Sequence, residues 1–94
     1  MSNSVSVKVS RRGDGWVAEV QVGDGRETTR HTVAVSNADA VRWGRGDGDA
    51  DVEDLVRRSF EFLLQREPAT SILRRFDLAV IQRYFPEYDQ QFKR

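Results

Sequence analysis

Alternation between apolar and polar residues over the first 36 residues constrains the fold of this chain more than any other feature. Three runs, "SVSVKVS", "WVAEVQV" and "HTVAV", place an apolar or weakly polar residue at every second position. This period of two is typical of β-strands with one buried face. The residues expected on the buried face are Val5, Val7, Val9, Trp16, Ala18, Val20, Val22, His31, Val33 and Val35.

Glycine-rich connections separate the three runs. Gly-Asp-Gly occurs at 13–15 and again at 23–25, and Gly13 and Gly15 can adopt the positive φ that a tight hairpin requires. Short connections favour antiparallel pairing of neighbouring strands. We therefore predict a three-stranded antiparallel meander over residues 4–36, with one face covered and the other in contact with solvent.

A short helix is predicted at residues 37–43, where the period changes. Ser36 can cap its first turn, and Gly44 can end it. The residues that follow, "GRGDGDA", predict a flexible acidic loop that leads into the next helix.

The clearest helical pattern covers residues 52–66. Asp51 is the predicted N-cap, and Pro68 ends the helix. Phe62 lies at the edge of the apolar stripe, where it is expected to contact a neighbouring element. The stripe recurs every three or four residues and consists of Val52, Leu55, Val56, Ser59, Phe60, Leu63 and Leu64.

The C-terminal stretch "SILRRFDLAVIQRYFPEY", residues 71–88, combines aliphatic, aromatic and arginine side chains. Asp77 can cap a helix that carries Leu78, Ile81 and Phe85, and Pro86 can end that helix and begin a last turn. The helix at 52–66 is too narrow to cover a three-stranded sheet. The C-terminal helices are therefore expected to complete its cover.

Together these elements predict an α+β fold, with a three-stranded antiparallel meander followed by, and packed against, two or three C-terminal helices. The 94 residues are predicted to form a single domain, because domains of about 100–150 residues are the commonest. Its predicted parts are the meander at 4–36, the short helix and acidic loop at 37–50, and the helical part at 51–92.

The segment "SFEFLLQREPATSILRRFDLAVIQRYFPEY" resembles a recurring C-terminal segment of small bacterial proteins whose function is not established. The shared pattern is "REP", "SILRRFDL", an isoleucine and "RYFPEY", which spans about a third of the chain. The likeness implies a small bacterial domain. It implies no activity and no catalytic residue.

Composition narrows the function classes. The chain contains no cysteine, which excludes disulfides, thiolate zinc sites and cysteine nucleophiles. The first residues do not have the pattern of a signal peptide, and no apolar run is long enough for a membrane span. These features predict a cytoplasmic protein without membrane association. Fifteen basic and fifteen acidic residues balance, so a field that attracts nucleic acid to the whole protein is not indicated.

Residues with catalytic potential are few. His31 is the only histidine, and it shares a strand face with Val33 and Val35, which favours a structural role. Asp47, Asp49 and Asp51 have the spacing that begins a calcium loop, but the glycine and the final glutamate of such a loop are missing. We therefore predict no catalytic residue, no metal site and no cofactor, and a protein that is not an enzyme. A small hydrolase that uses His31 with an aspartate is a third reading, behind the two binding functions below.

The C-terminal stretch carries the candidate binding residues, which are Arg74, Arg75, Arg83, Tyr84, Tyr88 and Phe92. A small domain buries only part of its aromatic residues, and exposed aromatics beside arginine are enriched at protein interfaces. The leading prediction is a non-enzymatic binding or assembly module that contacts a protein partner or a second copy of itself. The alternative is a nucleic-acid-binding module that uses the arginine-bearing C-terminal helices. A purely structural role, in which these arginines pair with neighbouring acidic residues, also remains open.

Overall fold

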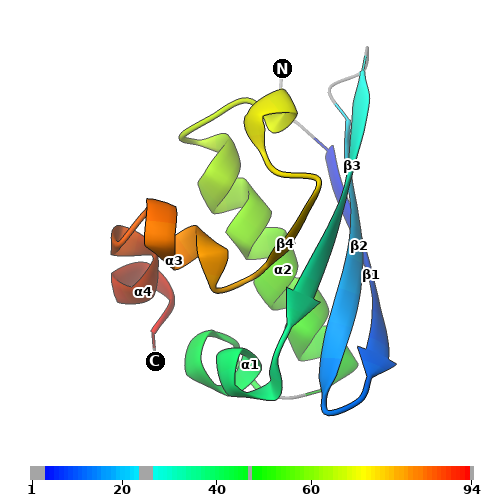
Figure 1. Ribbon diagram of the computed structural model, residues 1–94, viewed down its shortest axis with the longest axis vertical. Helices are drawn as coiled ribbons and strands as arrows, with labels where there is room; N and C mark the ends of the chain where they lie inside the picture. The colour runs from blue at the N-terminus through cyan, green and yellow to red at the C-terminus, as the bar shows by residue number, and fades with distance from the viewer. Residues whose placement is uncertain (1–3, 24–26, 47, 94) are drawn as a thin grey trace.

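The computed structural model describes residues 4–23, 27–46 and 48–93, and a four-stranded sheet forms one of its two layers (Figure 1). Strands β1 (Ser4–Arg12), β2 (Gly15–Gly23) and β3 (Thr28–Val35) form an antiparallel meander. This confirms the predicted α+β class and the predicted meander. A short fourth strand, β4 (Arg75–Asp77), was not predicted; it pairs with β3 in parallel and gives the order β1-β2-β3-β4.

The first hairpin uses its two glycines in different ways. Gly13 has a φ of 60°, as a tight turn requires. Gly15 does not have a positive φ, and here the prediction was wrong. A β-carbon at Gly15 would lie 2.5 Å from the carbonyl oxygen of Val35, so glycine permits a close approach of two chains there. The predicted second turn at 23–25 falls mostly outside the described residues.

Five helical segments follow the meander, and they all lie on one side of the sheet (Figure 1). They are α1 (Asn37–Trp43), α2 (Asp49–Leu64), the 3₁₀ turn η1 (Ala69–Ser71), α3 (Val80–Tyr84) and α4 (Glu87–Phe92). Helix α1 matches its prediction, because the Asp39 amide donates to the Ser36 hydroxyl at 3.1 Å. Among the described residues, no helix has the length and apolar character needed to cross a membrane.

Helix α2 begins earlier than predicted. Its N-cap is Gly48, and Asp51 lies inside the first turn, where its carboxylate accepts the Gly48 amide at 3.3 Å. Asp51 was therefore wrongly predicted as the N-cap. Asp49 has a separate role, because its carboxylate accepts the indole N–H of Trp16 at 2.9 Å. This bond fixes the start of α2 against β2.

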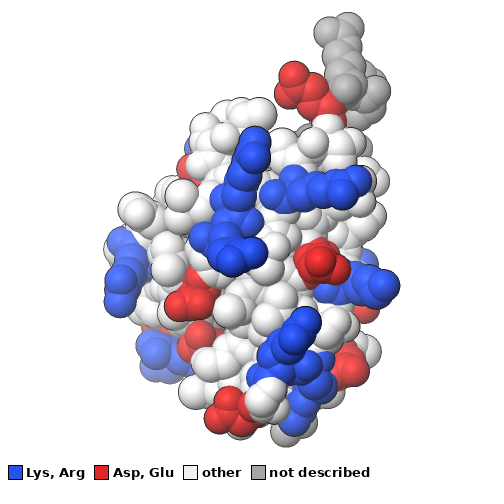
Figure 2. Space-filling model, turned by 45° about the vertical axis from the view of Figure 1, so that its right-hand side comes forward, with Lys and Arg blue, Asp and Glu red and all other residues white. Residues whose placement is uncertain are grey.

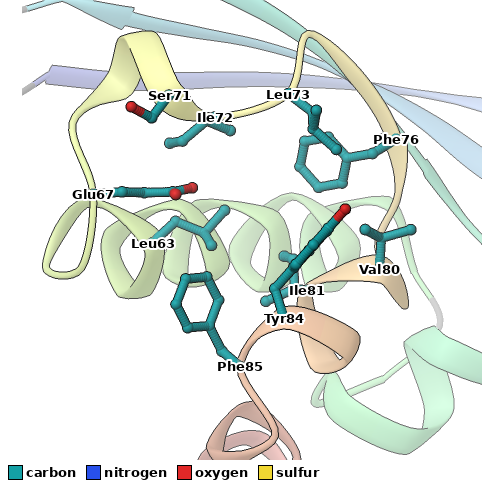
Figure 3. A pocket seen from close by; sticks show the side chains of 10 residues that line it. All are labelled: Leu63, Glu67, Ser71, Ile72, Leu73, Phe76, Val80, Ile81, Tyr84 and Phe85. Atoms are coloured by element: carbon teal, nitrogen blue, oxygen red, sulfur yellow. The ribbon is translucent and has the colours of Figure 1, made fainter.

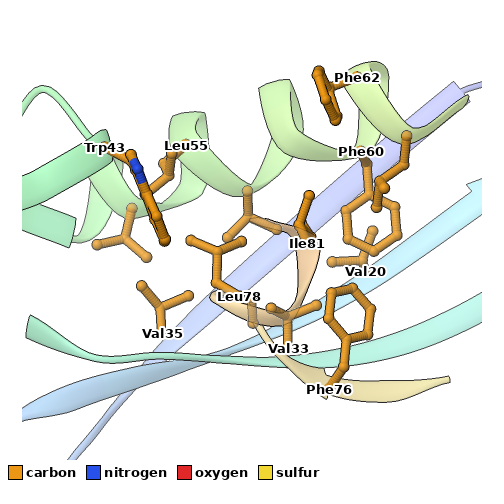
Figure 4. Packing of buried hydrophobic residues seen from close by; sticks show 14 of the residues in the cluster. Val20, Val33, Val35, Trp43, Leu55, Phe60, Phe62, Phe76, Leu78 and Ile81 are labelled. Atoms are coloured by element: carbon orange, nitrogen blue, oxygen red, sulfur yellow. The ribbon is translucent and has the colours of Figure 1, made fainter. Parts of the chain in front are cut away.

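The core lies between α2 and the sheet (Figure 4). Alternate side chains of the strands point toward the helices, as the period of two predicts. Phe62 is buried, and its ring packs against Tyr88 and Phe92 of α4. The innermost side chains are Trp16, Val22, Val33, Val35, Trp43, Val52, Leu55, Val56, Ser59, Phe60, Leu78 and Tyr88.

The segment around Asp77 is where the structure departs most from the prediction. A helix capped by Asp77 was expected, but residues 75–77 are a strand and α3 begins only at Val80. The edge of β3 explains this difference. The Thr32 amide donates to the Arg74 carbonyl at 2.7 Å, and the Leu78 amide donates to the Ala34 carbonyl at 2.9 Å. Main-chain groups of β3 that would otherwise lack partners hold this segment extended.

Candidate functional site

The structure separates the six residues predicted to form a binding surface. Arg74, Arg75, Arg83 and Tyr84 are exposed. Tyr88 and Phe92 are buried, so their assignment to a binding surface was wrong. The remaining four lie along β4 and α3.

Tyr88 and Phe92 belong to an aromatic cluster beneath α4. Their rings stack with a centroid distance of 4.3 Å, and the rings of Phe62 and Tyr88 form a T-shaped pair with a centroid distance of 5.3 Å. The Ser59 hydroxyl donates to the Leu55 carbonyl, so the phenol of Tyr88 donates to Ser59, at 2.7 Å. Burial raises the pKa of Tyr88 well above its usual range. The ring of Tyr88 is therefore packed against other rings, and its hydroxyl has a hydrogen-bond partner inside the protein.

Polar bonds attach α4 to α1 at the rim of this cluster. The Asp89 carboxylate accepts the Trp43 indole N–H at 2.8 Å and pairs with Arg42 at 3.1 Å. The bond from Trp43, followed by the charge of Arg42, lowers the pKa of Asp89. Helix α4 has six residues, and these bonds compensate for its shortness.

An apolar groove of about 400 Å³ lies next to β4 (Figure 3). Side chains from α2, from the η1–β4 connection and from α3 converge on it. Two of them are unusually exposed for their size, Tyr84 at 68% and Leu73 at 50%. We call this feature the β4 groove; it is lined by Leu63, Glu67, Ser71, Ile72, Leu73, Phe76, Val80, Ile81, Tyr84 and Phe85.

His31 holds one wall of the β4 groove in place. Its Nδ1 lies 2.8 Å from the Leu73 carbonyl, which can only accept, so Nδ1 carries the proton. The Nε2 atom forms a hydrogen bond with the Thr29 hydroxyl at 2.9 Å. The ring also packs on Phe60 at 5.2 Å. His31 is 3% exposed and both nitrogens are occupied, which supports a structural role for the imidazole.

A second hollow lies on the opposite face of the same sheet edge. We call it the outer hollow; its volume is about 700 Å³. It shares Leu73, Phe76, Val80 and Tyr84 with the β4 groove. Its other lining residues are Val17, Thr32, Ala34, Arg75, Asp77 and Arg83. The edge formed by β4 is therefore hollowed on both of its faces.

The arginines divide into paired and unpaired groups. Arg57, Arg58 and Arg66 form salt bridges to Glu53, Asp54 and Glu87. Arg30, Arg74, Arg75 and Arg83 form no salt bridge with any residue that the structure describes. Arg30 and Arg74 line one small hollow together, and Arg75 and Arg83 line the outer hollow. Four cationic side chains without a carboxylate partner therefore border β4.

Negative charge near β4 is limited. Asp77 lines the outer hollow, and Glu67 lines the far end of the β4 groove. On the face drawn in Figure 2, lysine and arginine side chains alternate with acidic ones and with uncharged surface. This face carries a mixed pattern of charge rather than one continuous positive field.

Metal-binding chemistry has little support within 4–23, 27–46 and 48–93. No three side chains of histidine, aspartate or glutamate gather there in a way that could hold a metal ion. Asp49 and Asp51 are bonded to Trp16 and to the Gly48 amide. Asp47, the first residue of the calcium-like spacing, lies outside the described residues.

The sequence did not reveal the β4 groove. The C-terminal stretch was predicted to cover the sheet, but its residues Leu73 and Val80 also line the groove. A usable signal exists, because "SILRRFDL" contains alternate apolar residues at Phe76 and Leu78 between charged ones. That short alternation predicts a strand, but the stronger helical pattern that follows concealed it.

Comparison of the chain with protein-family models, with curated proteins and with solved structures found no match. The functional argument therefore rests on the β4 groove, the outer hollow and the charges that surround them.

Proposed function

We propose that this protein is a non-enzymatic binding module that acts through protein–protein contact at the β4 groove. The main support is the exposure of Tyr84 and Leu73 beside an apolar groove of about 400 Å³. Gathered apolar surface on a small protein marks an interaction site more often than isolated exposed residues do. Tyrosine and arginine are also the residue types that most often dominate binding energy.

The surrounding charges define the chemistry of the partner. Arg74, Arg75 and Arg83 have no carboxylate partner among the described residues, and their guanidinium groups suit paired bonds to carboxylates. The partner is therefore an acidic protein segment that also presents a large apolar side chain. The apolar side chain would fill the groove, and the acidic residues would pair with the arginines.

Nucleic-acid binding is the alternative function, and an experiment must distinguish it from protein binding. It was predicted to use the arginine-bearing C-terminal helices, but Arg57 and Arg58 on α2 and Arg66 in the turn after it are bonded to carboxylates. Arg75 lies on β4, and among the residues that the structure describes only Arg83 lies on a helix beside an exposed aromatic ring. An apolar groove also offers little to a phosphate backbone. These observations favour a protein partner.

The experiment is a selection from a displayed library of random peptides with the intact protein as bait. We expect enriched peptides to combine a large apolar residue with aspartate or glutamate. Their affinity should fall about tenfold or more for Tyr84→Ala, the loss typical of a central interface residue. Val41 on α1 is 59% exposed and distant from β4 in sequence, so Val41→Ala is the matched control.

Two results would overturn the proposal. One is a selection that enriches no sequence, or the same sequences for wild type and Tyr84→Ala. The other is tight binding of single-stranded RNA or DNA that weakens steeply with salt, because such a dependence indicates phosphate contacts. Light scattering in parallel shows whether a second copy occupies the groove, since Tyr84→Ala would then convert a dimer to a monomer.

A further inference from the structure

From the geometry of this sheet edge, we infer that the partner segment binds as an extended strand that pairs with β4 and continues the sheet. This inference rests on the proposed function and specifies the form of the bound segment. Three features of the described residues support it: the free side of β4, the hollows on both faces of the edge, and the distribution of charge along it.

The first feature is the main chain of β4. In the order β1-β2-β3-β4, β4 is an outer strand. The Arg74 carbonyl and the Leu78 amide bond to β3, and in a parallel ladder alternate residues face the same neighbour. The main-chain groups of Arg75 and Asp77 therefore point away from β3. Unpaired groups of this kind can accept another strand.

The second feature is the pair of hollows. Side chains of an added strand would point alternately to the two faces of the sheet. Phe76 marks the helix side of β4, because it pairs with buried Val33. Arg75 and Asp77 mark the outer side, beside Thr32 and Ala34. One set of partner side chains would enter the β4 groove, and the other set would lie over the outer hollow.

The third feature is charge. Arg75 and Arg83 line the outer hollow, whereas the β4 groove is apolar except for Glu67 and Ser71 at its far end. Acidic residues should therefore alternate with apolar residues in the bound segment. Asp77 at the end of β4 would repel an acidic residue, so the acidic positions should lie toward Arg74 and Arg75. A bound helix would instead repeat its apolar residues every three or four positions.

The other outer strand does not offer the same features. Strand β1 is longer, but its exposed side chains are polar or charged, with Lys8 at its centre. Most residues that line the hollow beside Lys8 are polar or charged, among them Glu19, Gln21 and Thr32. A lysine in the middle of an outer strand opposes pairing. Strand β1 is therefore the internal control.

The experiment uses a short synthetic peptide in which glutamate alternates with valine, with blocked ends. Two derivatives carry N-methyl groups, either on the glutamates or on the valines. A strand pairs through alternate residues, so one derivative should lose about tenfold or more in affinity and the other should change little. A peptide of equal composition in the order Glu-Glu-Val-Val controls for charge.

Variants of β4 in the protein test the same inference, that the peptide pairs with this strand. Arg75→Pro removes an amide that points outward, and proline is tolerated at such positions of outer strands. Arg75→Gln removes only the charge. We expect Arg75→Pro to bind more weakly than Arg75→Gln, while the Thr32 amide stays protected from hydrogen exchange in both. In wild type, the peptide should protect the amides of Arg75 and Asp77.

The outcomes separate the two levels of the proposal. Equal binding of both N-methylated peptides, with loss of affinity for Tyr84→Ala, would overturn the strand pairing and leave the proposed function intact. Protection of β1 amides instead of β4 amides would also overturn it. If neither this peptide nor any peptide from the library binds, the proposed function itself fails.

Discussion

The two ends of the C-terminal segment carry similar residues but differ in what covers them. At the α4 end, Tyr88 and Phe92 are enclosed by Trp43 and Phe62. At the β4 end, Tyr84 and Leu73 border a groove that nothing within the described residues fills. An aromatic residue next to charged residues therefore does not identify a binding surface. Whether such a residue is exposed depends on whether a second element of the same chain packs over its ring.

The largest contrast should come from removing one tyrosine at each end. Tyr88→Ala deletes a fully buried ring and the hydrogen bond that its hydroxyl donates to Ser59, so we expect a loss of about 3–5 kcal/mol in the free energy of unfolding. This loss is large enough to unfold part of the population of a small domain. Urea denaturation followed by tryptophan fluorescence measures it, with Tyr88→Phe as the milder variant. A loss below about 1 kcal/mol for Tyr88→Ala would contradict the enclosed α4 end.

The next largest effect concerns the wall of the β4 groove. His31→Phe keeps an aromatic ring but removes both of its hydrogen bonds and leaves the Leu73 carbonyl unpaired. We expect a loss of about 1–3 kcal/mol and faster hydrogen exchange of the Thr32 amide, which bonds to Arg74. Thr29→Val removes only the bond at Nε2 and is the control. Unchanged exchange at Thr32 in His31→Phe would show that β4 is held without His31.

A smaller effect depends on pH and concerns the α4 end alone. The bond from Trp43 and the charge of Arg42 lower the pKa of Asp89 in the folded state. A lowered pKa stabilises the fold above the ordinary aspartate pKa, and this contribution is lost as the pH falls through the folded value. Asp89→Asn should therefore unfold at a lower temperature than wild type at pH 7.

The difference between Asp89→Asn and wild type should begin to shrink as the pH falls below the ordinary aspartate pKa of about 4, and should be lost once the pH passes the lower pKa of folded Asp89. Thermal unfolding at several pH values measures it. A difference that stays constant down to pH 2 would mean that the ionised form of Asp89 contributes nothing. Such a result would weaken the view that polar bonds attach α4.

The smallest effect on stability should come from Tyr84. Its side chain is 68% exposed, so Tyr84→Ala should change the free energy of unfolding by no more than about 0.5 kcal/mol. The same variant should lose partner binding. A destabilisation close to that of Tyr88→Ala would erase the distinction between the two ends and remove Tyr84 from the proposed site.

The sequence predicted elements well where the pattern is local. In β1 and β2, apolar and polar residues alternate over seven positions. Ser36 and Gly44 mark the two ends of α1. Strand β4 has only three residues and exists because β3 has an edge with unpaired main-chain groups. That cause lies more than forty residues away in the sequence, between Thr32 and Arg74, and a local pattern cannot contain it.

Only part of the candidate site was predicted correctly, again because a local pattern does not contain tertiary contacts. Arg74, Arg75, Arg83 and Tyr84 are exposed, as their charge and polarity suggested. Tyr88 was misplaced because its burial depends on the return of α4 to Trp43 and Phe62, which is a tertiary contact. The expectation that a small domain buries only part of its aromatic residues agrees with the structure, because Tyr88 and Phe92 are buried and Tyr84 is exposed; which of them are buried could not be read from the local pattern.

The bond between His31 and the Leu73 carbonyl joins residues 42 positions apart. Long-range closures of this kind come late when a chain acquires its structure, because the entropy of the intervening loop must first be overcome. A partly folded chain would then contain the meander and α2 but would lack the proposed binding surface at β4. The rate at which peptide binding appears during refolding would then report the rate at which the β4 segment docks on β3.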